Sequence, residues 1–182
     1  MSIVELDTYL FLKIQNSIVG ANRIIDEIFL AISNYSLIFF AAAAVFLLIH
    51  LMIVRKPGWH KQIFIIIIAI AVPTIISYFG RPVIGRPRPF LVLDFEPLLT
   101  HTGYVSFPSN HATAAFAVAM AVFAYNRKAG IVLMVPALLT ALSRVYVGVH
   151  YPLDIIAGGL LGIILAWAII RCPRLLRNKT GS

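Results

Sequence analysis

The stretch YSLIFFAAAAVFLLIHLMIV, residues 35–54, decides the fold class, because it contains no Asp, Glu, Lys or Arg. An α-helix of about 20 apolar residues is long enough to cross the hydrocarbon core of a bilayer. The whole chain of 182 residues has the same character, with 60% hydrophobic and 12% charged residues. A single soluble core does not need so long an uncharged run. We therefore expect one integral membrane domain spanning residues 1–182.

Further apolar runs follow along the chain, and the length of each favours a membrane-spanning helix. They cover residues 62–80, 111–126, 130–147 and 153–171. The run 111–126 is short for the hydrocarbon core, so we expect its polar N-terminal end to lie in a cavity within the protein. Glycines in the last run would let neighbouring helices approach closely. The sequence predicts an all-α, polytopic membrane helix bundle of about five transmembrane helices.

The N-terminal segment, residues 1–34, mixes apolar and charged residues. Leu6 and Leu10 recur at helical spacing beside charged side chains, a pattern typical of amphipathic helices at the membrane interface. A sixth span here is the alternative. It would have to bury Asp26 and Glu27, and carboxylates within a membrane are energetically costly.

The basic residues indicate how the chain is oriented. The loops 55–61 and 127–128 and the tail 171–182 hold nine of the fifteen Lys and Arg residues, and none of the seven acidic ones. Five spans place all three regions on one side, which the positive-inside rule makes cytoplasmic. We expect a multi-pass protein of the cell (inner or plasma) membrane with its N-terminus outside. The net charge of +8 then reflects topology and lipid headgroups, so no nucleic-acid partner is expected.

Polar residues collect on the opposite, extracytoplasmic side. Three segments within residues 80–155 contain them, and each adjoins the end of a predicted span. The segments are GRPVIGRPRP (80–89), SFPSNHA (106–112) and SRVYVGVHYPLD (143–154). The five-span topology brings all three to one membrane face. Charged groups at membrane depth mark functional sites by default, so we expect the active site here.

Arginines dominate two of these segments, at Arg81, Arg86, Arg88 and Arg144. Any one of them alone is explained by contact with lipid headgroups. Together they resemble a phosphate clamp, because a guanidinium binds two phosphate oxygens at once and keeps its charge. The prolines between the first three stiffen that segment.

The segment 106–112 has the features of a helix start. Ser109 follows Pro108 and precedes an apolar run, which is typical of an N-cap residue. A plain capped helix explains this pattern, but the N–H groups at a helix start also bind anions. His111, in the first turn, would then face a bound phosphate. The two interpretations are compatible.

The segment 143–154 places His150 just before a helix that begins near Pro152, with Asp154 one turn along. A carboxylate four residues after a histidine can fix its tautomer and leave Nε2 free to attack. A lone pair of this kind is more often structural, but a second histidine and several arginines favour nucleophilic catalysis. His111, His150 and Asp154 could instead bind a metal. The arginines would repel it, so we expect no metal and no cofactor.

The three segments resemble the tripartite signature of the type-2 phosphatidic acid phosphatase superfamily, which reads K-x6-R-P, P-S-G-H and S-R-x5-H-x3-D. Here the signature runs from Arg81 to Arg88-Pro89, through Pro108-Ser109-Asn110-His111, and from Ser143-Arg144 to His150 and Asp154. All internal spacings match. Arg81 stands where the signature has lysine, and Asn110 stands where it has glycine.

The resemblance implies a metal-independent lipid phosphatase that forms a phosphohistidine. In that scheme His150 is the nucleophile and Asp154 orients it. His111 protonates the leaving oxygen and later activates water. The phosphate oxygens are held by a set of side chains and one backbone group: Arg81, Arg88, Ser109, Asn110 and Arg144. Arg86 lies outside the signature, and could contact a second phosphate or only headgroups.

A looser resemblance suggests the substrate. The stretch FLKIQNSIVGANRIIDEIFLAISNY, residues 11–35, is similar to the N-terminal region of bacterial undecaprenyl-diphosphate phosphatases. These enzymes recycle a cell-wall carrier lipid, an activity linked to bacitracin resistance. Phosphatidylglycerophosphate, phosphatidate and lipid A phosphatases are the alternatives.

A non-enzymatic alternative is a small membrane carrier whose buried charges line a pathway. It would not explain the His–Asp pair at a helix start. The partners we expect are a lipid phosphate and membrane lipids, and no protein partner is predicted.

Overall fold

The computed structural model describes residues 1–55, 57–100 and 102–179, with side chains to Cys172. Throughout these ranges the regular elements are helices, which confirms the predicted all-α class. Two antiparallel residues, Pro87 and Val105, form an isolated bridge. The helices are α1 (Ile3–Ser17), α2 (Arg23–Val54), α3 (Trp59–Ile84), α4 (Pro89–Val92), α5 (Asn110–Tyr125), α6 (Arg127–Tyr146) and α7 (Pro152–Lys179).

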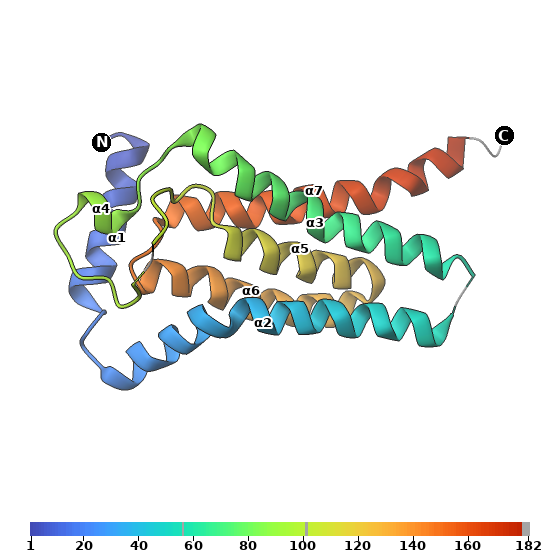
Figure 1. Ribbon diagram of the computed structural model, residues 1–182, viewed down its shortest axis with the longest axis horizontal. Helices are drawn as coiled ribbons and strands as arrows, with labels where there is room; N and C mark the ends of the chain where they lie inside the picture. The colour runs from blue at the N-terminus through green and yellow to red at the C-terminus, as the bar shows by residue number, and fades with distance from the viewer. Residues whose placement is uncertain (56, 101, 180–182) are drawn as a thin grey trace.

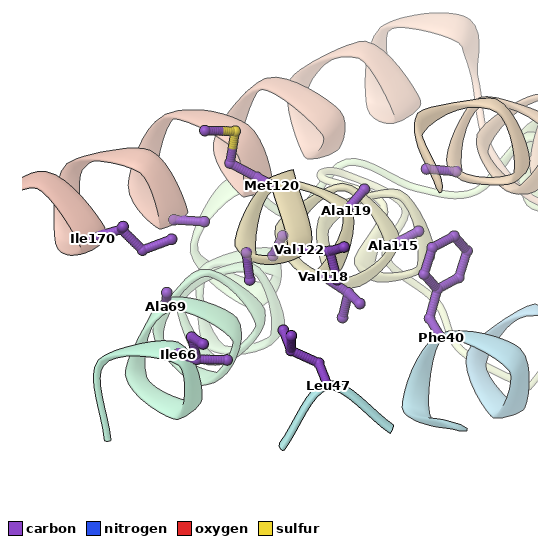
Figure 2. Close-up of a cluster of buried hydrophobic side chains, with 14 of the residues drawn as sticks. Phe40, Leu47, Ile66, Ala69, Ala115, Val118, Ala119, Met120, Val122 and Ile170 are labelled. Carbon is purple, nitrogen blue, oxygen red and sulfur yellow. The ribbon is translucent and has the colours of Figure 1, made fainter. Parts of the chain in front are cut away.

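Helix α5 forms the centre of the bundle and packs against α2, α3, α6 and α7 (Figure 1). Its small side chains make this possible, since a run of alanines and valines is almost entirely buried. Figure 2 shows Val118 of α5 facing the layer that contains Leu47 of α2 and Ile66 of α3, while Met120 points toward α7. The apolar core is thus built around the predicted short span.

The membrane-spanning character of the chain is confirmed by helix length. Four helices are long and apolar enough to cross a bilayer: α2, α3, α6 and the part of α7 from Pro152 to Cys172. Helix α5 has 16 residues and is shorter. It crosses the bundle inside a ring of longer helices, so its N-terminal end lies against protein rather than lipid. This is the arrangement expected for residues 111–126.

The second half of the N-terminal segment differs from the prediction. Residues 23–34 are not a separate interfacial helix but the beginning of α2, which runs unbroken from Arg23 to Val54. Asn22 caps this helix, because its side chain accepts hydrogen bonds from two backbone N–H groups of the first turn. Asp26 lies near the end of the bundle, where it accepts a hydrogen bond from Tyr146 Oη at 2.7 Å. The charged residues that suggested a break therefore sit at the end of the bundle.

Helix α1 lies across one end of the bundle (Figure 1). At 15 residues it is too short to span the membrane, so among the described residues the N-terminal segment contains no sixth span. Its buried face is formed by Asp7, Phe11 and Gln15, whereas Leu6 and Leu10 are exposed. The polar side chains of Asp7 and Gln15 point into the protein, which the predicted amphipathic pattern did not anticipate.

The two ends of the bundle differ in content (Figure 1). One end carries α1, α4 and the segment between α4 and α5, and the other carries the α2–α3 and α5–α6 loops and the last turns of α7. The segments 80–89, 106–112 and 143–154 all lie at the α1 end, which confirms that the predicted topology brings them together. The basic loops lie at the opposite end.

Glycines allow α7 to approach α5 closely, as expected from the sequence. A Cβ atom at Gly158 would lie 2.5 Å from the carbonyl oxygen of Ser109, and one at Gly162 would overlap the carbonyl oxygen of Thr113. Both obstacles are backbone atoms, which cannot rotate away. This contact therefore sets the spacing between the starts of α5 and α7.

We predict that Gly162→Ala will destabilise the bundle by about 2 kcal/mol, because the added methyl group forces the two helices apart. Gly80→Ala is the matched control, since a Cβ atom there meets nothing within 4 Å. Thermal unfolding of the detergent-solubilised variants should show a lower Tm for Gly162→Ala alone. Equal Tm values for both variants would contradict the close helix contact.

Candidate active site

The predicted His–Asp pair is present and fully buried at the start of α7. His150 Nδ1 lies 3.4 Å from Asp154 Oδ2, and both side chains are 0% exposed. The same carboxylate oxygen accepts the backbone N–H of Tyr151 at 2.9 Å. Pro152 is the first residue of the helix, where its missing N–H costs no hydrogen bond. Asp154 is thus held within one turn of the histidine.

A tight turn after α6 brings the backbone of His150 next to that of Arg144. Gly148 has φ +86°, a conformation that favours glycine, and a Cβ atom there would lie 2.7 Å from the ring of Phe95. The backbone N–H groups of Val149 and His150 both donate to the carbonyl oxygen of Arg144 at 3.2 Å. The turn therefore links the last motif arginine directly to the histidine.

Arg88 lies beside the imidazole. Its Nη1 is 3.5 Å from His150 Nε2 and donates to the carbonyl oxygen of Val149 at 2.8 Å. The side chain is 1% exposed, although arginine is almost never fully buried without a partner. The backbone N–H of Arg88 donates to the carbonyl oxygen of Tyr104 at 3.1 Å, which fixes this segment at the start of α4.

The other two motif arginines come from different helices. Arg144 Nη1 donates to the hydroxyl and to the carbonyl oxygen of Ser33 on α2. Arg81, near the end of α3, donates through Nε to the carbonyl oxygen of Pro108 at 2.9 Å. Each contact is made with backbone or hydroxyl oxygen rather than with a carboxylate, so neither positive charge is neutralised by it.

The start of α5 completes the site. Ser109 is the N-cap residue, as predicted, but its side chain makes no capping hydrogen bond. Its backbone N–H instead donates to the carbonyl oxygen of Asp154 at 3.0 Å. Asn110 accepts a hydrogen bond from the Ser77 hydroxyl of α3. His111 follows in the first turn of α5 and is partly exposed.

Three buried donors of this site have no hydrogen-bond partner within the part of the chain that the structure describes. They are Arg88 Nε, Arg144 Nε and Ser109 Oγ. Leaving such groups unpaired costs about 1–3 kcal/mol each, so proteins rarely do so without a reason. All three belong to residues that contact the segment 149–154, and a ligand with several acceptor oxygens would satisfy them together.

The electrostatics favour the same kind of ligand. Burial, together with the charge of Arg81, lowers the pKa of Arg88 to about 10, while the charge of Asp154 opposes this shift. Arg88 therefore remains cationic at neutral pH. Gathering several buried guanidinium groups is unfavourable unless an anion balances them. The site is suited to a phosphate group, whose oxygens match guanidinium geometry.

Arg86 has a different environment from the other arginines. The sequence left open a contact with a second phosphate or with headgroups, but the structure gives Arg86 two carboxylate partners. Nη1 lies 2.8 Å from Asp154 Oδ1 and Nη2 lies 2.6 Å from Asp7 Oδ2. The guanidinium also stacks over the ring of Tyr151, 3.9 Å from its centroid.

Sequence reasoning missed two residues that support this site, Asp7 and Ser33. Asp7, Phe11 and Gln15 follow one another at intervals of four positions, and this spacing places them on one helix face. That pattern was available as a signal, but it was hidden by the more conspicuous leucines. Ser33 lies in an apolar part of α2, and no signal in the sequence pairs it with Arg144. Among the described residues, no three His, Cys, Asp or Glu side chains group as a metal site would require.

Comparison with known proteins identifies relatives across most of the chain. Residues 61–177 match the model of the PAP2 superfamily. Undecaprenyl-diphosphatase BcrC of Bacillus subtilis is 31% identical over 156 residues, 86% of this chain and 79% of the relative. A protein of Bacillus licheniformis named bacitracin transport permease protein BcrC is 35% identical over 55% of this chain and 50% of its own length. Other relatives, which match over about half of this chain, are named lipid A phosphatases and phosphatidylglycerophosphatase B.

The fold has a solved counterpart. The crystal structure of Aquifex aeolicus LpxE superposes with a TM-score of 0.73 and 28% sequence identity, covering 94% of this chain and 99% of LpxE. The alignment includes the N-terminal helices that precede residue 61, because it covers almost the whole chain. The two structures thus share the fold over almost the whole of this chain.

We predict that inorganic phosphate will raise the Tm of the detergent-solubilised protein, because a ligand that binds only the folded state stabilises it. Arg144→Gln should remove most of this increase, while Arg23→Gln, at an exposed surface position, should retain it. Arg88 binds an anion only while charged. The increase should therefore persist at neutral pH and fade as pH rises past the Arg88 pKa of about 10. An equal Tm increase in Arg144→Gln would contradict the assignment of Arg144 to a phosphate-binding site.

Proposed function

This chain belongs to the PAP2 superfamily and is a membrane phosphatase, and we propose that its substrate is undecaprenyl diphosphate. Hydrolysis of the terminal phosphate gives undecaprenyl phosphate and inorganic phosphate, which returns the carrier lipid to cell-wall synthesis. The observation that carries the catalytic part of this proposal is the set of unpartnered donors, Arg88 Nε, Arg144 Nε and Ser109 Oγ, gathered around a buried His–Asp pair.

In the first chemical step, His150 Nε2 attacks the terminal phosphorus. The N–P bond forms as the bond from phosphorus to the bridging oxygen breaks, and His111 donates a proton to that oxygen. Asp154 lies on the Nδ1 side of the imidazole at 3.4 Å. A carboxylate there favours the tautomer with its proton on Nδ1 and stabilises the positive charge that develops on the ring.

In the second step, water replaces the histidine. His111, now without its proton, accepts one from the water molecule, whose oxygen attacks the phosphorus of the phosphohistidine. The N–P bond breaks, inorganic phosphate is released, and both histidines return to their starting states. The arginine side chains Arg81, Arg88 and Arg144, with Ser109 and the backbone at Asn110, hold the phosphate oxygens through both steps. We propose that these cations serve in place of a metal ion.

The substrate assignment is supported by the relatives. The protein named undecaprenyl-diphosphatase BcrC aligns over 156 residues. The match therefore includes a large part of residues 1–60, which the family model leaves out. Matches to lipid A and phosphatidylglycerophosphate phosphatases cover about half of the chain. These lipids are therefore the rival substrates. All of them present a terminal phosphate to the same side chains, so the rest of the lipid must decide between them.

We further propose that the site opens on the extracytoplasmic side of the inner membrane. The basic loops after α2 and α5 lie at the end of the bundle opposite the site. The positive-inside rule places that end in the cytoplasm.

Turnover of a substrate panel tests the proposed function. Purified protein in detergent should release inorganic phosphate faster from undecaprenyl diphosphate than from phosphatidylglycerophosphate, phosphatidate or lipid A, by about tenfold or more in kcat/KM. Preference for any rival would replace the substrate assignment, and no release from any of them would favour a carrier.

The matched control for this assay is His150→Ala. Its activity should fall below about a thousandth of wild type, because the variant lacks the nucleophile, while its Tm stays near the wild-type value. Activity should also survive EDTA, since no metal takes part. A variant with a tenth of wild-type activity would rule out His150 as the nucleophile.

Cysteine labelling tests the orientation in a Cys172→Ser background. In Glu96→Cys, at an exposed position, the thiol should react with a membrane-impermeant maleimide added outside intact cells. In Lys128→Cys, also at an exposed position, it should react only after the membrane is permeabilised. The reverse pattern would place the site in the cytoplasm.

A further inference from the structure

We propose that Asp7 on α1 is a positioning residue for catalysis, acting through Arg86 on the carboxylate of Asp154. The proposal rests on the role proposed above for Asp154. It assigns a function to the N-terminal helix, which lies outside the residues 61–177 that match the family model.

The contacts form a continuous chain from α1 to the imidazole. Asp7 Oδ2 pairs with Arg86 Nη2 at 2.6 Å, and Arg86 Nη1 pairs with Asp154 Oδ1 at 2.8 Å. The other oxygen of Asp154 lies 3.4 Å from His150 Nδ1. Arg86 thus presents its two terminal nitrogens to two different carboxylates, and the rigid planar guanidinium fixes their relative positions.

A second contact ties Asp7 to the backbone that carries Asp154. Asp7 Oδ1 accepts the N–H of Leu153 at 2.8 Å. This N–H belongs to the first turn of α7, where backbone donors have no partner within the helix. Asp7 therefore holds Asp154 in two ways, through Arg86 at the carboxylate and through Leu153 at the adjacent peptide.

The charges explain why both carboxylates are needed. Asp7 is 2% exposed and Asp154 is fully buried. With Asp154 alone, Arg86 could place both nitrogens on one carboxylate and draw it away from His150, because that bidentate geometry is favourable. Asp7 occupies Nη2, which limits Arg86 to a single contact with Asp154 and leaves Oδ2 to the His150 ring and the Tyr151 N–H.

The rest of α1 holds Asp7 in place. Phe11 packs edge-on against Phe95 and beside Tyr151, and Gln15 Nε2 donates to the carbonyl oxygen of Val145 at 2.8 Å. These contacts anchor the helix on both sides of the turn that precedes His150. The buried face of α1 is thus shaped to deliver one carboxylate to Arg86.

The test is steady-state release of inorganic phosphate from undecaprenyl diphosphate by the Asp7→Asn variant. Asparagine keeps an oxygen acceptor for the Leu153 N–H but loses the charge that holds Arg86. We expect kcat to fall about tenfold with KM changed less than about twofold, because the phosphate-binding arginines are untouched. Asp7→Glu, which restores the charge, should recover part of the loss. The matched control is Glu5→Gln, which removes an exposed carboxylate from the same helix and should leave kcat unchanged.

A double-mutant cycle separates positioning from simple anchoring of α1. If Asp7 acts through Arg86, Asp7→Asn should change kcat less than about twofold in an Arg86→Gln background. A full tenfold loss in that background, or a lower Tm with wild-type kcat, would overturn the proposal. If Asp7→Asn does not fold, Arg86→Lys replaces it, since an ammonium group cannot bridge the carboxylates as the fork does. Wild-type kcat in Arg86→Lys would equally overturn it.

Failure of the positioning role is distinguishable from failure of the proposed function. That failure appears as an inactive wild-type protein or an active His150→Ala variant. The positioning role fails only when wild type is active, His150→Ala is inactive, and the Asp7 or Arg86 variants give one of the overturning results.

Discussion

The hydrogen bond from the backbone N–H of Ser109 to the carbonyl oxygen of Asp154, 3.0 Å long, joins the starts of α5 and α7. The remaining geometry of the site depends on it. It requires the backbones of the two helices to be in direct contact, which glycine at position 158 permits. It also directs the N–H of Ser109 to protein, while the Ser109 hydroxyl keeps no partner within the described chain. A helix start that would otherwise only cap itself thereby becomes one wall of the site.

The electrostatic constraint follows from this arrangement. The arginines at positions 81, 88 and 144 belong to α3, to the start of α4 and to α6, and their side chains donate to the neutral oxygen atoms described above. Arg86, by contrast, is neutralised by two carboxylates. The protein thus sorts four arginines into a cationic group suited to bind an anion and one that pairs with the carboxylates of Asp7 and Asp154. Burial makes the distinction energetically significant, because unbalanced charge in a dry site is costly.

The N-terminal helices complete the organisation of the site. Helix α2 supplies Ser33 to Arg144, and Asp26 near its start accepts the Tyr146 hydroxyl. Helix α1 supplies Asp7 and Gln15. These polar side chains are expensive to bury and so have to be satisfied by specific partners. Here those partners are atoms of the motif segments themselves, which explains why a segment predicted to lie at the membrane interface is folded onto the candidate active site.

Much of this protein could be predicted from its sequence, because the relevant signals are local. Apolar run length indicates the spans, and the spacing of His150 and Asp154 predicts their pairing. The contacts of Arg86 could not be predicted, since the neighbouring Arg88 has similar sequence surroundings and faces the imidazole instead. Likewise, no local signal showed that Asp26 lies in the first turn of a helix continuous with residues 35–54, where it accepts the Tyr146 hydroxyl. By itself the sequence determined the helical class and the long apolar spans, because these follow from composition and run length along one segment, while the motif residues were indicated by the resemblance to the superfamily signature. Only the tertiary structure decided which charges neutralise each other, because ion pairs between Asp7, Arg86 and Asp154 join positions far apart in the chain, and helix packing sets their distances.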